Sequence, residues 1–261
     1  MLPGSFLYEQ NEFLVIAVLL AMLLIATEIG FRRGCQIRSK VEERARSQHS
    51  TLQAGVMALL ALLLAFTFSM SETRFETRKQ LLVDESNAIG TAWLRSRMLP
   101  EPYRADVAKL TRDYIDTRLD YYNTVLDQEK LDAANLESRR LRNELWSQAS
   151  GAEAKNPQPV PTGMFISSLN DIFEVGAKRD AARDNHVPQP VLFFLFFVTI
   201  LTVGLLGFGC GLGGHRNLSA TATVCVLISL VIMVIMDLDR PRRGLITISQ
   251  KPMLELRATL R

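Results

Sequence analysis

The sequence is poor in the residues that most often build metal sites and disulfide frameworks. It contains three histidines and three cysteines in 261 residues. None of the histidines has a cysteine or carboxylate neighbour at a spacing typical of zinc ligands. Cys35 and Cys210 follow long apolar runs and Cys225 lies inside one, so we expect neither a zinc site nor disulfide stapling. The sequence therefore predicts no metal and no cofactor.

Charge is missing altogether from four long stretches, residues 13–27, 47–71, 185–215 and 217–236. These stretches hold 91 residues, so all 57 charged side chains lie in the other 170. A soluble domain mixes apolar and charged positions within each helix or strand, and this segregation excludes an ordinary soluble domain. The hydrophobic share of 48% is also too high for a disordered chain.

A helix needs roughly 20 apolar residues to cross the hydrocarbon core of a membrane. We expect spans at about residues 13–31, 51–70, 190–209 and 217–236. The first span carries one carboxylate, Glu28, near its end and with no evident partner; it is the only ionisable side chain within a span. Glu9 and Glu12 precede this span and arginines follow it, the reverse of a signal peptide. An intramembrane enzyme would need more than one such group, so we expect no enzyme.

The fold class predicted is an all-α membrane protein with four transmembrane helices and a long-helix extramembrane bundle between spans two and three. The first transmembrane pair takes up residues 1–70, with a basic linker at 32–50, and the helical domain follows at 71–186. The second transmembrane pair lies at 187–236 and a basic tail at 237–261. Four spans place the domain and both termini on one face. The basic residues beside the first span favour a cytoplasmic linker under the positive-inside rule. Those beside the last two spans favour a cytoplasmic domain instead, so the orientation in the membrane stays open.

The large segment 71–186 has 17 basic and 19 acidic residues, which excludes a basic platform for nucleic acid. Its apolar positions repeat with helical spacing. We expect span two to continue as one helix to about Leu99, where Pro100 and Pro102 break it. A second helix starts near Tyr103 and breaks near residues 127–132.

A third helix is expected over residues 164–183, after a proline-rich linker, 156–163, that we expect not to be helical. In the tail, residues 245–248 resemble a strand. The pattern of Met253, Leu256 and Leu260 is amphipathic, and it predicts either docking on the helical domain or binding to the lipid surface.

Small residues recur at helical spacing in two spans. Gly207 and Gly211 have the small-xxx-small spacing that lets membrane helices approach closely, and they follow no strand as a phosphate loop would. Span two carries a seam of alanines followed by two aromatics, Ala54, Ala58, Ala61, Ala65, Phe66 and Phe68. This seam is either a helix-packing surface or the lining of a constriction in an oligomer.

Two polar clusters are further candidates for a functional site. The first is the motif Glu85, Asn87, Gly90 and Thr91, in which Asn87 and Thr91 share a helix face and glycine indicates a close approach. The second is a boundary cluster after span four, formed by Asp237, Asp239, Arg240, Pro241, Arg242 and Gly244. These charges either pair with each other and with helix ends or, repeated in an oligomer, attract ions to a vestibule.

Both clusters resemble the signatures of a bacterial membrane family described as bestrophin-like. The resembling stretches are residues 85–92 (Glu-Ser-Asn-Ala-Ile-Gly-Thr-Ala) and 237–250 (Asp-x-Asp-Arg-Pro-x-x-Gly-Leu-Ile-x-x-Ser-Gln), with 99–104 and 28–30 in addition. The resemblance runs from the first span to the tail and implies a multi-pass protein of the bacterial inner membrane.

A more remote resemblance, in layout, is to the bestrophins, which are pentameric ion channels with four spans per subunit and a large cytoplasmic helical segment. Bestrophins line the pore neck with apolar and aromatic residues of span two. Here span two is rich in alanine and leucine, and only Phe66 and Phe68 could supply an aromatic lining of that kind. No bestrophin pore residue is therefore carried over.

Two functions follow. The first is a homo-oligomeric ion channel or pore whose partners are the lipid bilayer and inorganic ions. The alternative is a non-conducting membrane scaffold or sensor whose helical domain binds a partner.

Overall fold

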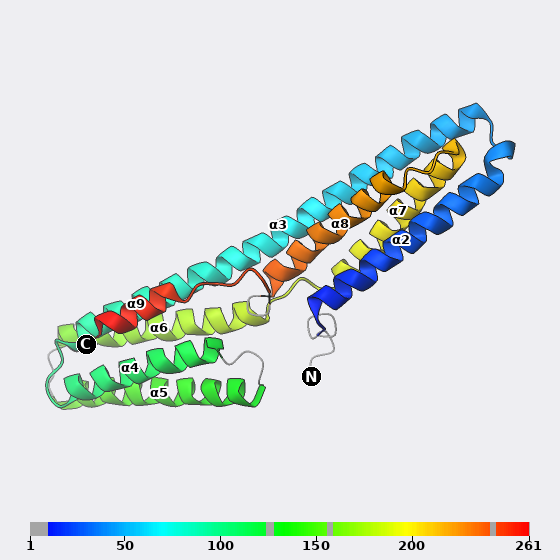
Figure 1. Ribbon diagram of the computed structural model, residues 1–261. Helices are drawn as coiled ribbons and strands as arrows, with labels where there is room; N and C mark the ends of the chain where they lie inside the picture. The colour runs from blue at the N-terminus through cyan, green and yellow to red at the C-terminus, as the bar shows by residue number, and fades with distance from the viewer. Residues whose placement is uncertain (1–9, 124–127, 156–158, 241–243, 261) are drawn as a thin grey trace. The chain divides into compact units, whose positions relative to one another are not determined.

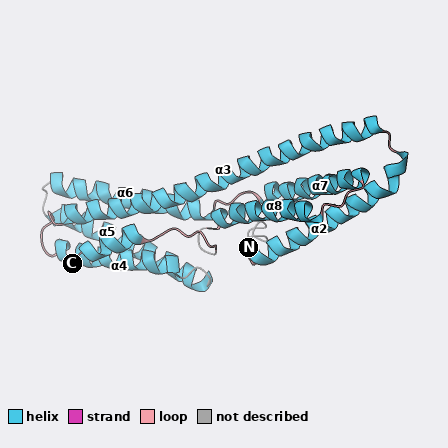
Figure 2. Cartoon of the chain, turned by 45° about the horizontal axis from the view of Figure 1, so that its top comes forward, coloured by secondary structure: helices cyan, strands magenta, loops and turns pink. Residues whose placement is uncertain are grey.

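The structure is a computed structural model and describes residues 10–123, 128–155, 159–240 and 244–260. These residues form helices and loops without a strand (Figures 1 and 2). The order is α2 (Glu12–Ile37), the short helix η1 (Arg38–Lys40), α3 (Glu43–Ser96), α4 (Tyr103–Asn123), α5 (Gln128–Lys155), α6 (Pro159–Asp184), α7 (Gln189–Gly213), α8 (Leu218–Asp239) and α9 (Lys251–Thr259). The all-helical prediction is confirmed, and the strand-like run at 245–248 forms a loop.

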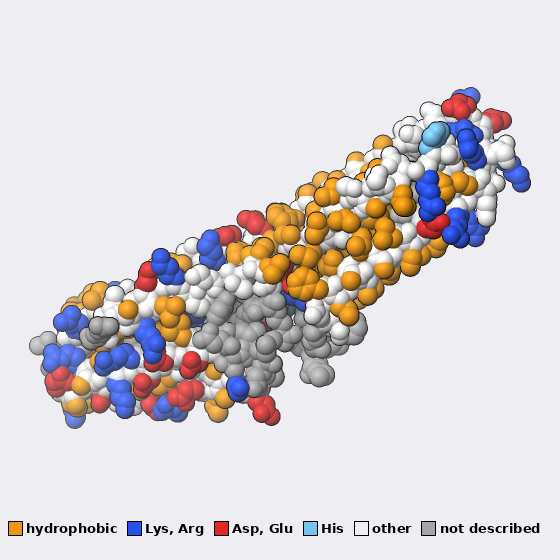
Figure 3. Space-filling view, viewed as in Figure 1, with side chains coloured by type: hydrophobic (Ala, Val, Ile, Leu, Met, Phe, Trp, Pro, Cys, Tyr) orange, Lys and Arg blue, Asp and Glu red, His pale blue; other side chains and the backbone are white. Residues whose placement is uncertain are grey.

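The chain divides into two compact units. The membrane unit comprises Met1–Arg74 and His186–Arg240, and the helical unit comprises Phe75–Asn185 and Pro241–Arg261. On the face seen in Figure 3, apolar side chains gather over the helices of the membrane unit, whereas acidic and basic side chains intersperse over the helical unit.

Among the described residues, four helices are long and apolar enough to cross a membrane. They contain the four predicted spans, and each extends beyond the apolar stretch. The first two show this most clearly, because α2 runs on to Ile37 and α3 begins at Glu43 and ends only at Ser96. The polar residues that flank a span continue the helix, since nothing there removes a backbone hydrogen bond.

Glycines bring α2 and α7 into backbone contact. A Cβ atom on Gly207 would lie 2.1 Å from the carbonyl oxygen of Thr27, and one on Gly211 would lie 2.3 Å from that of Phe31. Gly30 of α2 fits equally closely against Gly204. Any larger side chain would force the helices apart, so the close approach predicted for Gly207 and Gly211 is confirmed.

The helical unit packs around an apolar core to which α3 to α6 and α9 all contribute, with Ile89, Val107, Leu141, Phe165 and Met253 among its buried members. α3 ends at Ser96, three residues before the predicted end. The break between α4 and α5 falls after Asn123, slightly earlier than expected.

The linker predicted at 156–163 is wrong over residues 159–163, because α6 begins at Pro159. Residues 156–158 lie outside the described residues. Pro159 and Pro161 occupy the first turn of this helix. Backbone N–H groups in a first turn have no intrahelical partner, so proline there costs no hydrogen bond. The proline-rich composition therefore marks a helix start.

The C-terminal tail docks on the helical unit. Ile248, Met253 and Leu260 are buried in its core. Ser86 of α3 donates a hydrogen bond to the carbonyl oxygen of Pro252, at 3.1 Å. Of the two alternatives for the amphipathic tail, the structure therefore shows docking on the domain.

Candidate functional site

A buried ionic network centred on Glu85 joins three helices of the helical unit. Arg118 of α4 places its Nε 2.8 Å from Glu85 Oε1 and its Nη2 3.3 Å from Glu85 Oε2. Arg179 of α6 donates to the same Oε2, and the hydroxyl of Tyr114 donates to Oε1 at 3.2 Å. Glu85 and Arg118 are 0% and 1% exposed. The carboxylate is thus compensated by two guanidinium groups and a phenol.

The network continues to α6 and the tail. Arg118 Nη1 donates to Asp180 Oδ1 at 3.0 Å, and Arg179 Nη2 donates to Gln250 Oε1 at 3.1 Å. Gly176 makes room for it, because a Cβ atom there would lie 3.3 Å from the Tyr114 hydroxyl. Six side chains from α3, α4, α6 and the tail are therefore joined in one network.

Electrostatics keep this network in one protonation state. Burial lowers the pKa of the Arg118 guanidinium, but the carboxylates of Glu85 and Asp180 outweigh burial, so its pKa is raised and it stays charged. Burial, together with the Glu85 carboxylate, raises the pKa of the Tyr114 phenol, which stays neutral and donates its proton. Glu85 is fully engaged by these donors, so the network is suited to holding helices in register.

The predicted polar motif splits over two faces of α3. Glu85 is buried, whereas Asn87 and Thr91 are exposed, and Thr91 Oγ1 donates to the Asn87 carbonyl oxygen at 2.9 Å. A Cβ atom on Gly90 would lie 3.4 Å from a side-chain carbon of Leu256 in α9. The glycine therefore allows the tail helix to approach, and Asn87 and Thr91 take no part in the network.

The sequence interpretation missed the partners of Glu85. Arg118 falls four residues after Tyr114 and three before Tyr121, on the apolar stripe of α4. A single charge on such a stripe signals a buried ion pair, because a buried charge is stable only when it is paired. That signal was present in the sequence, but it does not name the partner.

The boundary cluster after span four is partly described. Asp237, Asp239 and Arg240 are buried in the membrane unit. Asp239 Oδ2 accepts a hydrogen bond at 2.7 Å from the backbone N–H of Val187, just before α7, and Arg240 donates to the Gln10 carbonyl oxygen, just before α2. These contacts to helix starts favour the structural interpretation of the cluster.

Pro241 and Arg242 lie outside the described residues, and Gly244 belongs to the helical unit.

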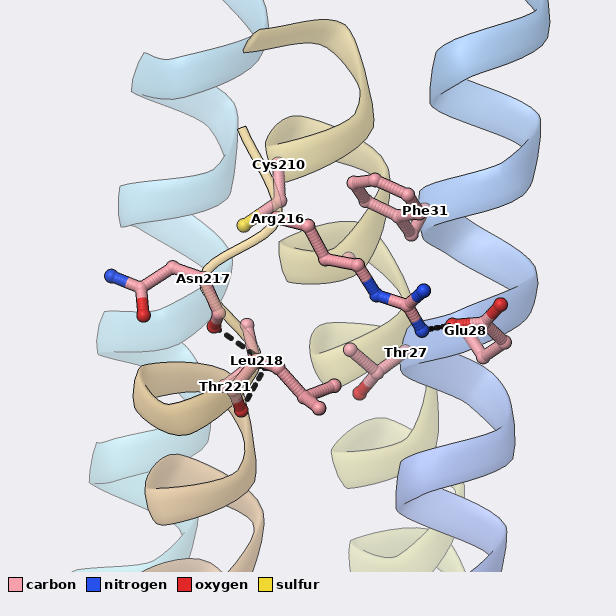
Figure 4. Close-up of a pocket in the computed structure, with 9 residues that line it drawn as sticks. Thr27, Glu28, Phe31, Cys210, Arg216, Asn217, Leu218 and Thr221 are labelled. Carbon is pink, nitrogen blue, oxygen red and sulfur yellow. Dashed lines mark hydrogen bonds and ion pairs between the residues drawn. The ribbon is translucent and has the colours of Figure 1, made fainter. Parts of the chain in front are cut away.

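A small cavity lies in the membrane unit beside the turn that joins α7 to α8 (Figure 4). Its volume of about 20 Å³ has room for one water molecule. Arg216 Nη2 lies 2.6 Å from Glu28 Oε2, and Arg32 Nε lies 2.7 Å from Glu28 Oε1. The expectation that Glu28 has no partner is therefore wrong, because Arg32 lies one helical turn away and Arg216, far away in the sequence, reaches it from the turn before α8.

The alanine seam of span two is exposed. Ala54, Ala58, Ala61 and Ala65 all face away from the other helices. Phe66 is 62% exposed, and Phe68 is exposed as well, whereas the neighbouring Leu60 is 2% exposed and faces the membrane-unit core. The seam is therefore not a packing surface within the subunit.

Comparison with known proteins identifies the family. The Bestrophin-like domain model matches residues 26–253. A search of curated proteins gave no significant match. A crystal structure of a bacterial bestrophin homologue from Klebsiella pneumoniae, carrying one substitution, superimposes with a TM-score of 0.70 at 15% identity, over 94% of this chain and 97% of that one.

A second structure of the bacterial bestrophin homologue from Klebsiella pneumoniae superimposes with a TM-score of 0.64 at 17% identity, over 96% of each chain. At sequence identities this low, the structural likeness shows a shared fold and nothing further. With a family match over most of its length and this fold, the chain is a membrane protein that belongs to the bestrophin-like family.

Proposed function

We propose that the chain is one subunit of a homo-oligomeric ion channel in the bacterial inner membrane, with the alanine seam of span two facing the oligomer axis. The observation that carries this proposal is the exposure of that seam in the single subunit. Membership of the bestrophin-like family supports it. A pentamer follows from the resemblance to bestrophins.

The chemistry of the seam fits a position at an axis. Small side chains let neighbouring helices approach closely, and four alanines at helical spacing give a continuous narrow surface. Phe68 is exposed and lies three residues after Ala65, so it continues this face at its end, where a ring of aromatic side chains would form an apolar constriction. Phe66 projects from a neighbouring face of the helix.

The structure also limits which charges serve the proposed channel. Glu85 does not face a conduction path, because it is buried and accepts from two arginines and a tyrosine. The carboxylate of Asp239 accepts a hydrogen bond from the backbone N–H of Val187. We therefore assign Glu85 and Asp239 to holding the subunit together.

Conductance of purified protein in planar bilayers tests the proposal. We expect single-channel currents, and we expect Phe68→Ala to change the unitary conductance by about twofold or more, because it removes an aromatic ring from the constriction. Phe193→Ala is the matched control, since Phe193 is an equally apolar and exposed residue of α7. It should leave the conductance unchanged.

An intact oligomer that is silent at both polarities would contradict the channel and support the scaffold or sensor. In that case a partner protein should co-purify with the full chain and be lost when residues 103–150 are deleted.

A further inference from the structure

A cavity of about 360 Å³ lies between α5 and α6 of the helical unit, two helices that pack against each other. Three arginines line it, Arg139 and Arg142 from α5 and Arg183 from α6. Ser138 and two aspartates, Asp180 and Asp184, complete its polar lining with Asn135. The volume falls in the range of sites for small ligands.

The two carboxylates of the cavity are already engaged. Asp180 accepts from Arg118 at 3.0 Å. Asp184 accepts from Nε and Nη2 of Arg183, at 2.7 and 3.1 Å. Arg139 and Arg142, in contrast, have no carboxylate within ion-pair distance among the residues described. Arg139 and Arg142 therefore form no ion pair among the described residues, and the lining of the cavity carries more positive than negative side chains.

Two hydrogen-bonding groups in the wall point to a ligand. Ser138 is 4% exposed, and its Oγ has no hydrogen-bond partner among the described residues. The Nη1 group of Arg183 is likewise buried and has no partner there, although the other donors of this guanidinium bind Asp184. A buried donor without a partner is unfavourable, and a bound acceptor would remove that cost.

We propose that this cavity binds a small phosphate-bearing molecule. Guanidinium groups match the geometry of phosphate oxygens, and hydrogen bonds between charged groups are the strong ones. A phosphate group between Arg139 and Arg142 on one side and Arg183 on the other would accept from the free Nη1 and from the Ser138 hydroxyl. The ligand would bridge α5 and α6. This site is independent of the proposed conduction path.

Isothermal titration of the full-length protein in detergent with inorganic phosphate tests the proposal. Sodium chloride holds the ionic strength constant, so that screening alone gives no signal. We expect saturable binding that Arg142→Ala weakens by about tenfold or more, because it removes a charge-assisted contact. Ser138→Ala is a milder change that leaves all charges in place, and it should weaken binding in the same direction.

Arg140→Ala is the matched control. Arg140 is the neighbour of Arg139 on α5, but it pairs with Glu137 and Glu144 outside the cavity. Its removal should leave the dissociation constant within about twofold, since it makes no contact with the ligand. Absence of saturable phosphate binding, or equal weakening by Arg140→Ala and Arg142→Ala in folded protein, would overturn the proposal.

A second titration with adenosine monophosphate separates the sources of the phosphate group. Tighter binding than that of inorganic phosphate supports a phosphorylated metabolite as ligand, and weaker binding supports the free ion.

Discussion

Glu85 and Arg118 form an ion pair, with 2.8 Å between Oε1 and Nε, in which both side chains are almost completely withdrawn from solvent. Glu85 lies on the same long helix as span two, and Arg118 lies on α4. A buried pair of this kind is costly to break, because the buried charge that remains loses its main partner. The position of α4 along α3 is therefore set by this contact.

Replacing Glu85 with glutamine should destabilise the helical unit by about 3 kcal/mol, since two buried arginines then lose their carboxylate. Tryptophan fluorescence during thermal unfolding measures this, because both tryptophans, Trp93 and Trp146, lie in this unit. Glu137→Gln is the control. It breaks an exposed pair with Arg140 and should cost less than about 1 kcal/mol. Equal melting temperatures for the two variants would contradict the role of Glu85.

The tail should loosen when its link to the network is cut. Gln250→Ala removes the acceptor of Arg179 Nη2 and should raise hydrogen exchange in residues 245–260, with a loss of about 1–2 kcal/mol. Hydrogen exchange detected by mass spectrometry measures the exchange rate of the tail directly. Ser249→Ala, at the preceding position, leaves the Arg179 contact intact. If exchange in the tail were the same in both variants, Gln250 would not anchor it.

Packing of the tail on the core predicts a large difference between two adjacent positions. Met253 is buried and Leu254 is exposed. Met253→Ala should cost about 2–4 kcal/mol through the cavity it leaves, whereas Leu254→Ala should cost less than about 0.5 kcal/mol. Thermal unfolding followed by tryptophan fluorescence compares them. A larger effect at Leu254 would indicate that the tail binds elsewhere, for example to lipid.

The contact between α2 and α7 predicts that a single added methyl group is harmful. Gly207→Ala places a Cβ against the Thr27 carbonyl oxygen and should destabilise the membrane unit by about 1–3 kcal/mol. Gly213→Ala, at the end of the same helix, meets no atom within 4 Å and should be neutral. Heat-induced aggregation in detergent ranks the two variants. Equal midpoints would mean that the helices separate freely.

The architecture could be predicted from local features of the sequence. Absence of charge locates the four spans, because lipid tolerates few charged side chains, and Pro100 and Pro102 mark the end of α3. The spacing of Gly207 and Gly211 predicts a close helix contact, because residues without a large side chain let two helices approach. Each of these signals resides in a few neighbouring residues.

The contacts that hold the sites together could not be predicted in this way. Arg179 meets Glu85 across 94 positions, and Arg216 meets Glu28 across 188. Such pairs depend on how helices pack, which no local pattern encodes. The exposure of Ala61 could not be predicted either, because a seam of alanines is compatible with packing within a subunit and with packing between subunits.

Cross-linking through the alanine seam tests the central claim most directly. In a background with all three native cysteines changed to serine, Ala61→Cys in native membranes should give a cross-linked dimer with a bis-maleimide reagent, because one cysteine per subunit can join only one neighbouring subunit. Leu60→Cys, which faces the subunit core, should give none. A monomer as the sole product for Ala61→Cys would contradict assembly around span two.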